Sequence, residues 1–344
     1  MDYCYVIAEA GVNHNGCSKL AIELIDIAAS AGADAIKFQS FTADELVSEG
    51  TEKAEYQRKD SELGDQHSML KNLEMSSDLH LSLIEHCDLR GIEFMSTAFD
   101  KETLDFLIHH GMKRIKIPSG ELTNHPFIKY IASKNMPIIM STGMASMDEI
   151  RETQVIIEIE RNRLGFEGSV DGILTILQCT SNYPTHPEDV NLRAMRAISD
   201  ITGMPIGYSD HTLGTVISTA AVALGAVIIE KHFTKSRKLP GPDHAASLEP
   251  HELCELISNV RTVSMALGSA TKRPTESELP VRQLVRRSIT LNRDVMSGHI
   301  LGEVDITLKR PGSGIEPKHL SEVTGRKVLR DLVRGHTLNW TDLK

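Results

Sequence analysis

Short apolar runs recur along most of this chain, and each is followed by a segment whose apolar residues have helical spacing. Runs this short and this apolar are typical of strands buried on both faces, as in a parallel sheet. The segments that follow predict covering helices, for example over Lys19–Ala31, Asp78–Leu89, Ser146–Ile159 and Thr215–Leu224. The eight predicted strands are Tyr5–Gly11, Ala35–Ser40, Glu93–Phe99, Arg114–Gly120, Pro137–Gly143, Ile173–Cys179, Ile206–Thr212 and Val227–Phe233.

Eight alternating strand and helix units in about 270 residues predict an α/β fold of the (β/α)8 or TIM barrel type. A doubly wound open sheet is the structural alternative. It fits less well, because no Gly-x-Gly-x-x-Gly follows the first strand and polar residues crowd the ends of all eight strands rather than two. We therefore expect a closed barrel.

A change in character near residues 268–287 indicates a domain boundary. The stretch from Gly268 to Pro274 begins a polar segment that ends in Arg286 and Arg287, as in a linker. Short strands and turn glycines follow, and no internal sequence repeat is apparent beyond the strand and helix alternation. The sequence predicts a barrel over residues 1–270, a linker over 271–287 and a small C-terminal domain over 288–344.

Composition narrows the classes of function. The 37 basic and 47 acidic residues leave a formal charge of −10, which argues against nucleic acid and acidic membrane surfaces as main partners. No apolar run is long enough for a membrane span and no signal-peptide pattern is apparent, so we expect a cytoplasmic protein. The five cysteines are scattered and odd in number, which predicts reduced thiols rather than disulfides or a zinc cluster.

Polar side chains gather at the predicted carboxyl ends of the strands, where barrel enzymes build their active sites. Two histidines, His211 and His232, each end a short apolar strand, about one strand-to-strand repeat apart. Two lysines, Lys37 and Lys116, lie on the second and fourth strands. The other polar candidates are Glu9, Gln39, Thr97, Ser119, Glu121, Ser141, Ser181, Asn182, Tyr183, Ser209 and Glu230.

These residue types predict an anion site beside a metal site. Two lysines with several hydroxyls and loop amides would hold a phosphate or a carboxylate. Two imidazoles with open positions would hold Mn²⁺, Mg²⁺, Zn²⁺ or Fe²⁺, with water and substrate oxygens completing the shell. Such a metal would polarise a carbonyl group.

Each of these residues also has a structural interpretation. A histidine at a strand end is often only hydrogen-bonded, and an inward lysine is often half of a buried ion pair, here Lys116 with Glu121 or Lys37 with Glu9. Glu230 fits a structural partner better than a catalyst. The functional interpretation is favoured because polar candidates from different strands converge at the same end of the predicted barrel.

Longer motifs stand at these strand ends and in the C-terminal domain. They are Ile7-Ala-Glu-Ala-Gly-Val-Asn-His-Asn-Gly16, Lys37-Phe-Gln39, Lys116-Ile-Pro-Ser-Gly-Glu121, Ser141-Thr-Gly-Met144, Ser209-Asp-His211, Glu230-Lys-His-Phe233, Gly241-Pro-Asp243 and Lys309-Arg-Pro-Gly312. With these motifs the chain resembles the sialic acid synthase family, over essentially its whole length and in the family's order. The tail is similar to that family's small antifreeze-like (SAF) domain.

The resemblance implies an enzyme that condenses phosphoenolpyruvate (PEP) with an N-acylated mannose-type sugar in open-chain form, giving a nine-carbon 2-keto acid and phosphate. It implies that His211 and His232 bind Mn²⁺ or Mg²⁺, and that Glu9 and Glu121 are the general acid and base candidates. Arg310 matches an arginine that reaches the sugar in the neighbouring subunit, which implies a domain-swapped homodimer. The PEP-binding positions match Lys37, Thr97, Lys116, Ser119, Ser141 and Ser209, and the sugar-binding positions match Gln39, Tyr183, Asp243 and Arg310.

Members of this family differ in the sugar they use. N-acetylmannosamine gives N-acetylneuraminate, which we expect first. A 2,4-diacetamido-6-deoxy mannose gives legionaminate and is the alternative, with pseudaminate or a 6-phosphate substrate behind. The segments Phe41–Ser76 and Lys235–His244 are where a difference at sugar carbons 4 to 6 would be sensed.

Two further classes of function stay open. One is a barrel that binds a sugar or anion without turnover, which would predict a missing lysine, histidine or carboxylate, and none is missing. The other is metal-dependent aldol cleavage without PEP, which would not need the paired lysines. Phosphate release that depends on both substrates separates these possibilities.

Overall fold

The computed structural model describes residues 3–53 and 64–344. It divides into two compact units, Met1–Gly268 and Ser269–Lys344. Residues 54–63, inside the Phe41–Ser76 segment that is expected to sense the sugar, lie outside the described residues.

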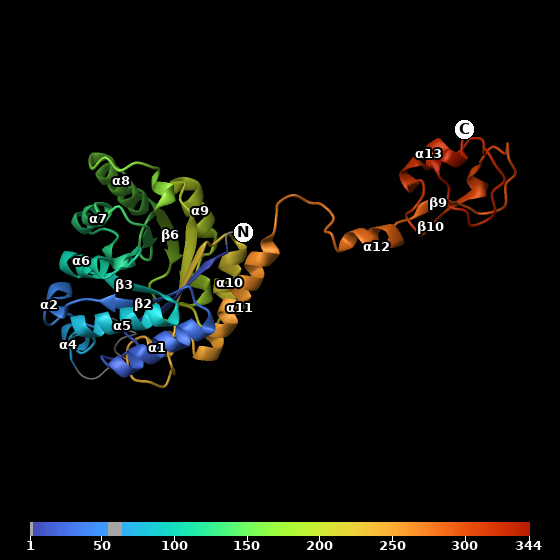
Figure 1. Ribbon diagram of the computed structural model, residues 1–344. Coiled ribbons are helices and arrows are strands. Elements are labelled where there is room, and N and C mark those ends of the chain that lie inside the picture. Colours follow the sequence, from blue (N-terminus) through green and yellow to red (C-terminus); the bar gives the residue numbers. More distant parts are fainter. Residues whose placement is uncertain (1–2, 54–63) are drawn as a thin grey trace. The chain divides into compact units, whose positions relative to one another are not determined.

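The first unit is the predicted barrel. Its eight parallel strands form one sheet in the order β3-β2-β1-β8-β7-β6-β5-β4, with helices around it (Figure 1). The first strand pairs with both the second and the last, so that Glu9 lies opposite Lys37 on one side and His232 on the other. The strands are β1 Tyr5–Gly11, β2 Ala35–Ser40, β3 Glu93–Ala98, β4 Ile115–Ile117, β5 Ile138–Ser141, β6 Leu174–Cys179, β7 Ile206–Asp210 and β8 Ile228–His232.

The fourth strand is shorter than predicted. The expected strand was Arg114–Gly120, whereas β4 covers only Ile115–Ile117. Pro118 has no N–H for a ladder hydrogen bond, and Ser119–Glu121 form a single 3-10 turn. This early end releases Ser119 from the sheet, and its hydroxyl accepts a hydrogen bond from the Gly143 amide at 2.9 Å.

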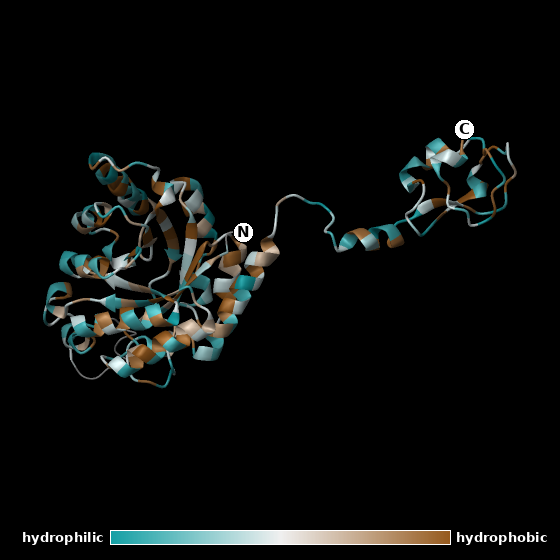
Figure 2. Ribbon diagram, viewed as in Figure 1, coloured by the Kyte–Doolittle hydropathy of each residue, from teal (hydrophilic) through white to brown (hydrophobic). Residues whose placement is uncertain are grey.

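The helices cover the strands and confirm the predicted alternation. Figure 2 shows hydrophobic and hydrophilic residues alternating along them, as expected for helices with one face on a sheet. Among the described residues, no helix is both long and apolar enough to span a bilayer. The helices of this unit are α1 Ser18–Ala31, α2 Ala43–Leu46, α4 Gln66–Lys71, α5 Ser77–Arg90, α6 Lys101–His109, α7 His125–Ala132, α8 Met147–Arg163, α9 Arg193–Thr202, α10 Val216–Ala223 and α11 Pro250–Leu267.

The interior of the barrel has an apolar layer below a polar one. Side chains alternate along a strand, so residues two apart point to the same side. On β1, for example, Ile7 belongs to the apolar layer and Glu9 lies one step further toward the carboxyl end of the strand. The polar layer is therefore held on a packed support. The apolar layer consists of Ile7, Ala35, Met95, Ile139, Leu177 and Ile228.

The second unit has its own small core. The strands β9 Ser288–Leu291 and β10 Ile306–Lys309 pair in antiparallel register, and buried residues such as Leu291, Val323 and Leu338 pack together. Two helices belong to this unit, α12 Glu278–Val285, which lies in the stretch expected as a linker, and α13 Leu320–Val323.

The second unit also contains an internal repeat, so the expectation of no such repeat was wrong. The pattern Arg-Asp-x-x-x-Gly-His-x-Leu-x-x-x-Asp occurs over residues 293–305 and again over 330–342. In both copies the buried aspartate at the end, Asp305 or Asp342, accepts hydrogen bonds from the arginine and the histidine of its own copy. The signal was visible in the sequence, but it is too short to stand out without the shared contacts.

Candidate active site

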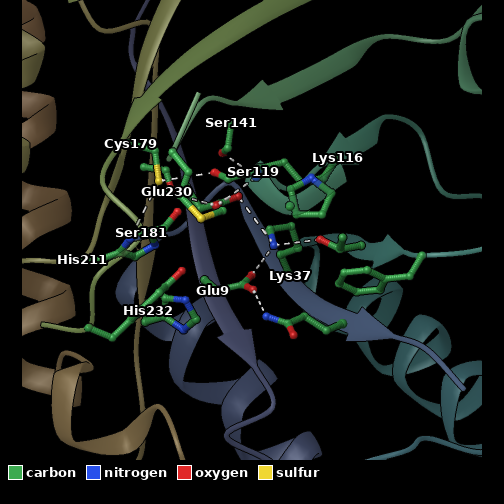
Figure 3. Close-up of a pocket in the computed structure, with 18 residues that line it drawn as sticks. Glu9, Lys37, Lys116, Ser119, Ser141, Cys179, Ser181, His211, Glu230 and His232 are labelled. Carbon is green, nitrogen blue, oxygen red and sulfur yellow. Dashed lines mark hydrogen bonds and ion pairs between the residues drawn. The ribbon is translucent and has the colours of Figure 1, made fainter. Parts of the chain in front are cut away.

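One cleft at the carboxyl ends of the strands, about 360 Å³ in volume, collects most of the predicted site residues. Figure 3 shows the labelled side chains converging on it from different strands. The cleft lies directly above the apolar layer of the barrel. The predicted residues that line it are Glu9, Lys37, Gln39, Thr97, Lys116, Ser119, Ser141, Tyr183, Ser209, His211 and His232.

Three predicted residues do not line this cleft. Glu121 lies in the 3-10 turn after β4, where its carboxylate accepts a hydrogen bond from Asn124 at 2.7 Å. Asp243 lines a smaller cavity beside the cleft. Arg310 belongs to the second unit, so its contact with a sugar stays a prediction. Of the polar candidates before Tyr183, Ser181 lines the cleft and Asn182 does not.

The two buried lysines share one carboxylate that sequence reasoning did not count as a site residue. Lys37 Nζ lies 2.7 Å from Glu9 Oε2, the ion pair that the sequence suggested. Lys116 does not pair with Glu121, as the sequence also suggested, but lies 3.4 Å from Glu230 Oε1. Glu230 Oε2 is also 3.6 Å from Lys37 Nζ. The sequence signals for Glu230 were its inward position on the last strand, two residues before His232, and its place in the motif Glu230-Lys-His-Phe233.

The two carboxylates of this network have opposite pKa shifts. Burial raises the pKa of Glu9 to about 7, although Lys37 opposes the shift. Burial would also raise the pKa of Glu230, but Lys116 and Lys37 outweigh it and hold that pKa at about 2. Glu230 is therefore a permanent counter-charge for the lysines. Glu9 is the group that can take up and release a proton near neutral pH.

Hydroxyl groups and a loop amide surround the lysines. Lys116 Nζ donates to Ser141 Oγ at 2.7 Å, and Lys37 Nζ donates to Thr97 Oγ1 at 3.1 Å. A Cβ at Gly143 would collide with the Ser181 hydroxyl, so glycine lets the β5 loop approach this closely without displacing that side chain. The result is a small cationic cradle suited to a phosphate or carboxylate group.

The two histidines have the donor atoms that a divalent metal needs. His211 Nδ1 donates to the Thr180 carbonyl at 2.7 Å, which leaves the lone pair on Nε2. His232 Nδ1 is buried without a hydrogen-bond partner, and burial, followed by the neighbouring His211, holds the pKa of His232 well below its ordinary value. The rings lie 5.6 Å apart between centroids. Burial would lower the pKa of His211 too, but its interaction with Cys179 outweighs burial and raises that pKa instead, so a metal would compete with a proton for this ring. In their neutral forms the two imidazoles fit as metal ligands.

The protein donors at this position number two rather than three. Among the described residues, no cluster of three or more His, Cys, Asp or Glu side chains is arranged to hold a metal. Substrate and water oxygens would complete the coordination shell, which suits a catalytic site with open positions rather than a structural one.

A buried ion pair joins the two histidine-bearing strands on the outer side of the barrel. Lys231 Nζ lies 2.7 Å from Asp210 Oδ2 and also donates to the Thr212 carbonyl at 2.7 Å. Both charged side chains are almost fully buried. Asp210 precedes His211 and Lys231 precedes His232, so the pair links the backbone at the two histidines.

Comparisons with known proteins identify a family for each part of the chain. The sequence profile of the NeuB family matches residues 24–272, and that of the SAF domain matches residues 286–344. An N,N'-diacetyllegionaminic acid synthase of Legionella pneumophila is 48% identical over 342 residues, which cover 99% of this chain and 95% of that relative. One of Campylobacter jejuni is 45% identical over 322 residues, 93% of this chain and 94% of the relative.

A solved structure shares the architecture. The crystal structure of N-acetylneuraminic acid (sialic acid) synthetase from Leptospira borgpetersenii serovar Hardjo-bovis, in complex with citrate, matches with a TM-score of 0.71 and 34% identity. The match covers 81% of this chain and 90% of that one.

Fold, site and relatives together define a transferase that forms a carbon–carbon bond from PEP, in the class of nonulosonic acid synthases. More narrowly, the chain belongs to the NeuB family and carries a C-terminal SAF domain. The family expected from the motifs is thereby confirmed.

Proposed function

We propose that this enzyme is an N,N'-diacetyllegionaminate synthase, which condenses PEP with open-chain 2,4-diacetamido-2,4,6-trideoxymannose and releases phosphate. The observation that carries this proposal is 48% identity over 99% of the chain to a relative of that name, against 34% to the synthetase named for N-acetylneuraminic acid. The sequence motifs had favoured N-acetylneuraminate and left legionaminate as the alternative. The comparisons favour that alternative.

PEP binds in the cationic cradle. Lys37 and Lys116 neutralise its phosphate and carboxylate, and the hydroxyls of Ser119, Ser141 and Ser209 donate hydrogen bonds to them. Lysine is a point charge that can release phosphate again, whereas a bidentate arginine would hold it more tightly. Thr97 orients Lys37 through the hydrogen bond between them.

The sugar binds above PEP, against the two histidines. His211 and His232 would hold Mn²⁺ or Mg²⁺, which would supply Lewis-acid polarisation of the sugar aldehyde. Gln39, Tyr183 and Asp243 bind the sugar chain, since they lie on the same side as His232. His211, His232 and Asp243 are buried, which excludes bulk water and strengthens their electrostatic contacts.

The reaction then needs one controlled water molecule. Carbon 3 of PEP bonds to the aldehyde carbon, and the aldehyde oxygen takes a proton to become a hydroxyl. Positive charge develops at carbon 2 of PEP, where water adds as it loses a proton. Loss of phosphate from that carbon leaves the 2-keto group. Glu9 accepts the proton from water, because its pKa lies near 7 and it lies beside Lys37.

Assembly and location belong to the same proposal. Arg310 of one subunit reaches the sugar in the barrel of its neighbour, in a domain-swapped homodimer, as the family resemblance implies. The enzyme works in the cytoplasm on two small-molecule substrates.

Phosphate release from PEP tests the proposal. The assay contains Mn²⁺ and either 2,4-diacetamido-2,4,6-trideoxymannose or N-acetylmannosamine, with no-sugar and no-PEP controls. We expect at least about tenfold higher kcat/KM with the diacetamido sugar, equal to about 1.4 kcal/mol of transition-state discrimination. A tenfold preference for N-acetylmannosamine would instead identify an N-acetylneuraminate synthase. Phosphate release without any sugar would contradict a synthase altogether.

A further inference from the structure

A second cavity of about 90 Å³ opens beside the active-site cleft. The two cavities share three lining residues, Gln39, Tyr183 and His232. The second cavity is therefore the immediate neighbour of the space at the histidines where the sugar is proposed to bind.

One wall of this cavity is apolar. Met69 and Leu70 come from α4, Leu73 follows that helix, and Val12 and Pro242 complete the wall. We term the cavity with this wall the apolar annex. Met69 and Leu73 are buried and pack with Phe41, whose ring meets that of Phe99 edge-on. Asp243 lies at the polar side of the same cavity.

The annex is fixed before any substrate arrives. Asp65 caps α4 by accepting a hydrogen bond from the Ser68 amide at 2.9 Å. Glu74 accepts a hydrogen bond from the Ala43 amide at 2.7 Å, and Lys71 lies 3.0 Å from Asp44 on α2. These contacts tie α4 to α2, so the wall is a preformed surface rather than a mobile loop.

An apolar wall is a poor surface for a sugar that carries only hydroxyl groups beyond carbon 3. Each hydroxyl turned toward it would lose its hydrogen bond to water without gaining another. 2,4-Diacetamido-2,4,6-trideoxymannose differs from N-acetylmannosamine by an acetamido group on carbon 4 and a methyl group at carbon 6. An acetamido group has an apolar methyl end and an N–H donor, which matches an apolar wall that faces a carboxylate.

The size of the cavity fits that group. A water molecule needs roughly 10–15 Å³ of such space, so 90 Å³ accepts several non-hydrogen atoms, and an acetamido group has four.

We propose that the apolar annex is the subsite for the 4-acetamido group of the sugar, and that Met69, Leu70 and Leu73 determine specificity for it. The methyl end packs on these three side chains and the N–H points to Asp243. This inference rests on the proposed function, because it assigns a place to the group that distinguishes the proposed substrate.

Three sugars and three variants test the annex. The sugars are 2,4-diacetamido-2,4,6-trideoxymannose, N-acetylmannosamine and 2-acetamido-2,6-dideoxymannose, which has the methyl group but not the 4-acetamido group. Met69→Gln keeps the side-chain size and makes it polar, and Leu70→Gln changes a partly exposed residue that tolerates a polar side chain. Leu46→Gln is the control, since Leu46 packs on the same cluster but does not line the annex.

We expect kcat/KM for the diacetamido sugar to fall about tenfold in Met69→Gln and Leu70→Gln, while the values for the other two sugars change less than about threefold. The KM for PEP stays unchanged, and Leu46→Gln leaves all ratios as in the wild type. An equal loss for all three sugars would place a shared group in the annex and overturn the proposal. A loss shared with the 6-deoxy sugar would assign the annex to the methyl group, and no loss at all would leave it without a role.

The experiment distinguishes an error in the proposed substrate from an error in the role of the annex. A wild-type enzyme that prefers N-acetylmannosamine contradicts the proposed substrate, whatever the variants do. The variant-to-wild-type ratio for each sugar tests the annex separately, because it compares one sugar with itself.

Discussion

Removal of the ammonium group of Lys231 tests whether the buried ion pair behind His211 and His232 supports the proposed metal site. In Lys231→Met, Asp210 loses the charge 2.7 Å from its carboxylate, and the Thr212 carbonyl loses its donor. Asp210 keeps uncharged hydrogen-bond donors, among them the Ser218 hydroxyl and the Thr212 amide. An ionised carboxylate is then left buried without a counter-charge.

The expected loss of stability is large. Breaking a buried ion pair by removing one partner costs about 3–5 kcal/mol. At about 2–4 °C per kcal/mol for a unit of this size, the melting temperature of the barrel should fall by roughly 6–20 °C. Apparent affinity for Mn²⁺ should fall about tenfold, as it does when groups that orient metal ligands are removed.

The signal used to measure unfolding must come from the barrel rather than from the second unit. The only tryptophan, Trp340, lies in the second unit, so its fluorescence reports on that unit. Far-ultraviolet circular dichroism during urea unfolding follows the barrel helices, and calorimetry measures Mn²⁺ binding.

Two variants serve as controls. Lys235→Met removes an ion pair of the same length, Lys235 with Glu23 at 2.7 Å, from the surface, where the expected loss is below about 1 kcal/mol. The double variant Lys231→Met with Asp210→Leu replaces both buried charges and should recover most of the lost stability. The reasoning is refuted if Lys231→Met and Lys235→Met lower the unfolding free energy equally, or if the double variant is no more stable than the single one.

Three further outcomes are expected. In the wild type kcat/KM should rise as pH increases through about 7, because Glu9 acts as a base in its deprotonated form. Glu9→Gln should abolish this pH-dependent rise and lower the rate about 10²–10⁴-fold. Glu121→Gln should keep the pH-dependent rise. His211→Ala should lower Mn²⁺ affinity at least about tenfold by calorimetry, and unchanged affinity would exclude it as a ligand. Burial lowers the pKa of His244 to about 4, so between pH 6.5 and 4 the unfolded chain gains a proton at this residue that the folded chain does not. His244 should therefore contribute about 3 kcal/mol to the fall in unfolding free energy over that range, beside the contributions of His14 and His232, whose pKa values are also lowered. In urea titrations His244→Gln should reduce the slope by this part, and an unchanged slope would assign it to the other groups.

Much of the site could be predicted because strand side chains alternate. Glu9 and Lys37 each lie on a short strand with apolar neighbours two residues earlier, and the barrel brings them to 2.7 Å. That local rule also predicted the two histidines at one end of the barrel. It holds because a register shift of one residue would turn every buried side chain outward.

The rule failed where partners come from distant strands. The sequence offered Glu121 for Lys116 because the two residues are close in the chain. The structure pairs Lys116 with Glu230, since β4 ends early at Pro118 and the closed barrel brings β8 across the interior. Proximity in sequence does not predict which ion pairs form when eight strands contribute side chains to one barrel interior.

The apolar annex shows the same limit. The segments Phe41–Ser76 and Lys235–His244 were expected to sense the sugar, but no periodicity indicates which of their side chains meet. Met69 and Pro242 share one cavity only because α4 and the loop after β8 fold over the same strand ends.

The sequence by itself determined the eight-unit barrel, the polar end of its strands and the family, because these depend on spacing and residue type along the chain. Only the tertiary structure decided which carboxylate neutralises the lysines, which glutamate has a pKa near 7 and which side chains line the cavity beside the cleft. Those properties depend on burial and on distances between strands, and both arise when the sheet closes.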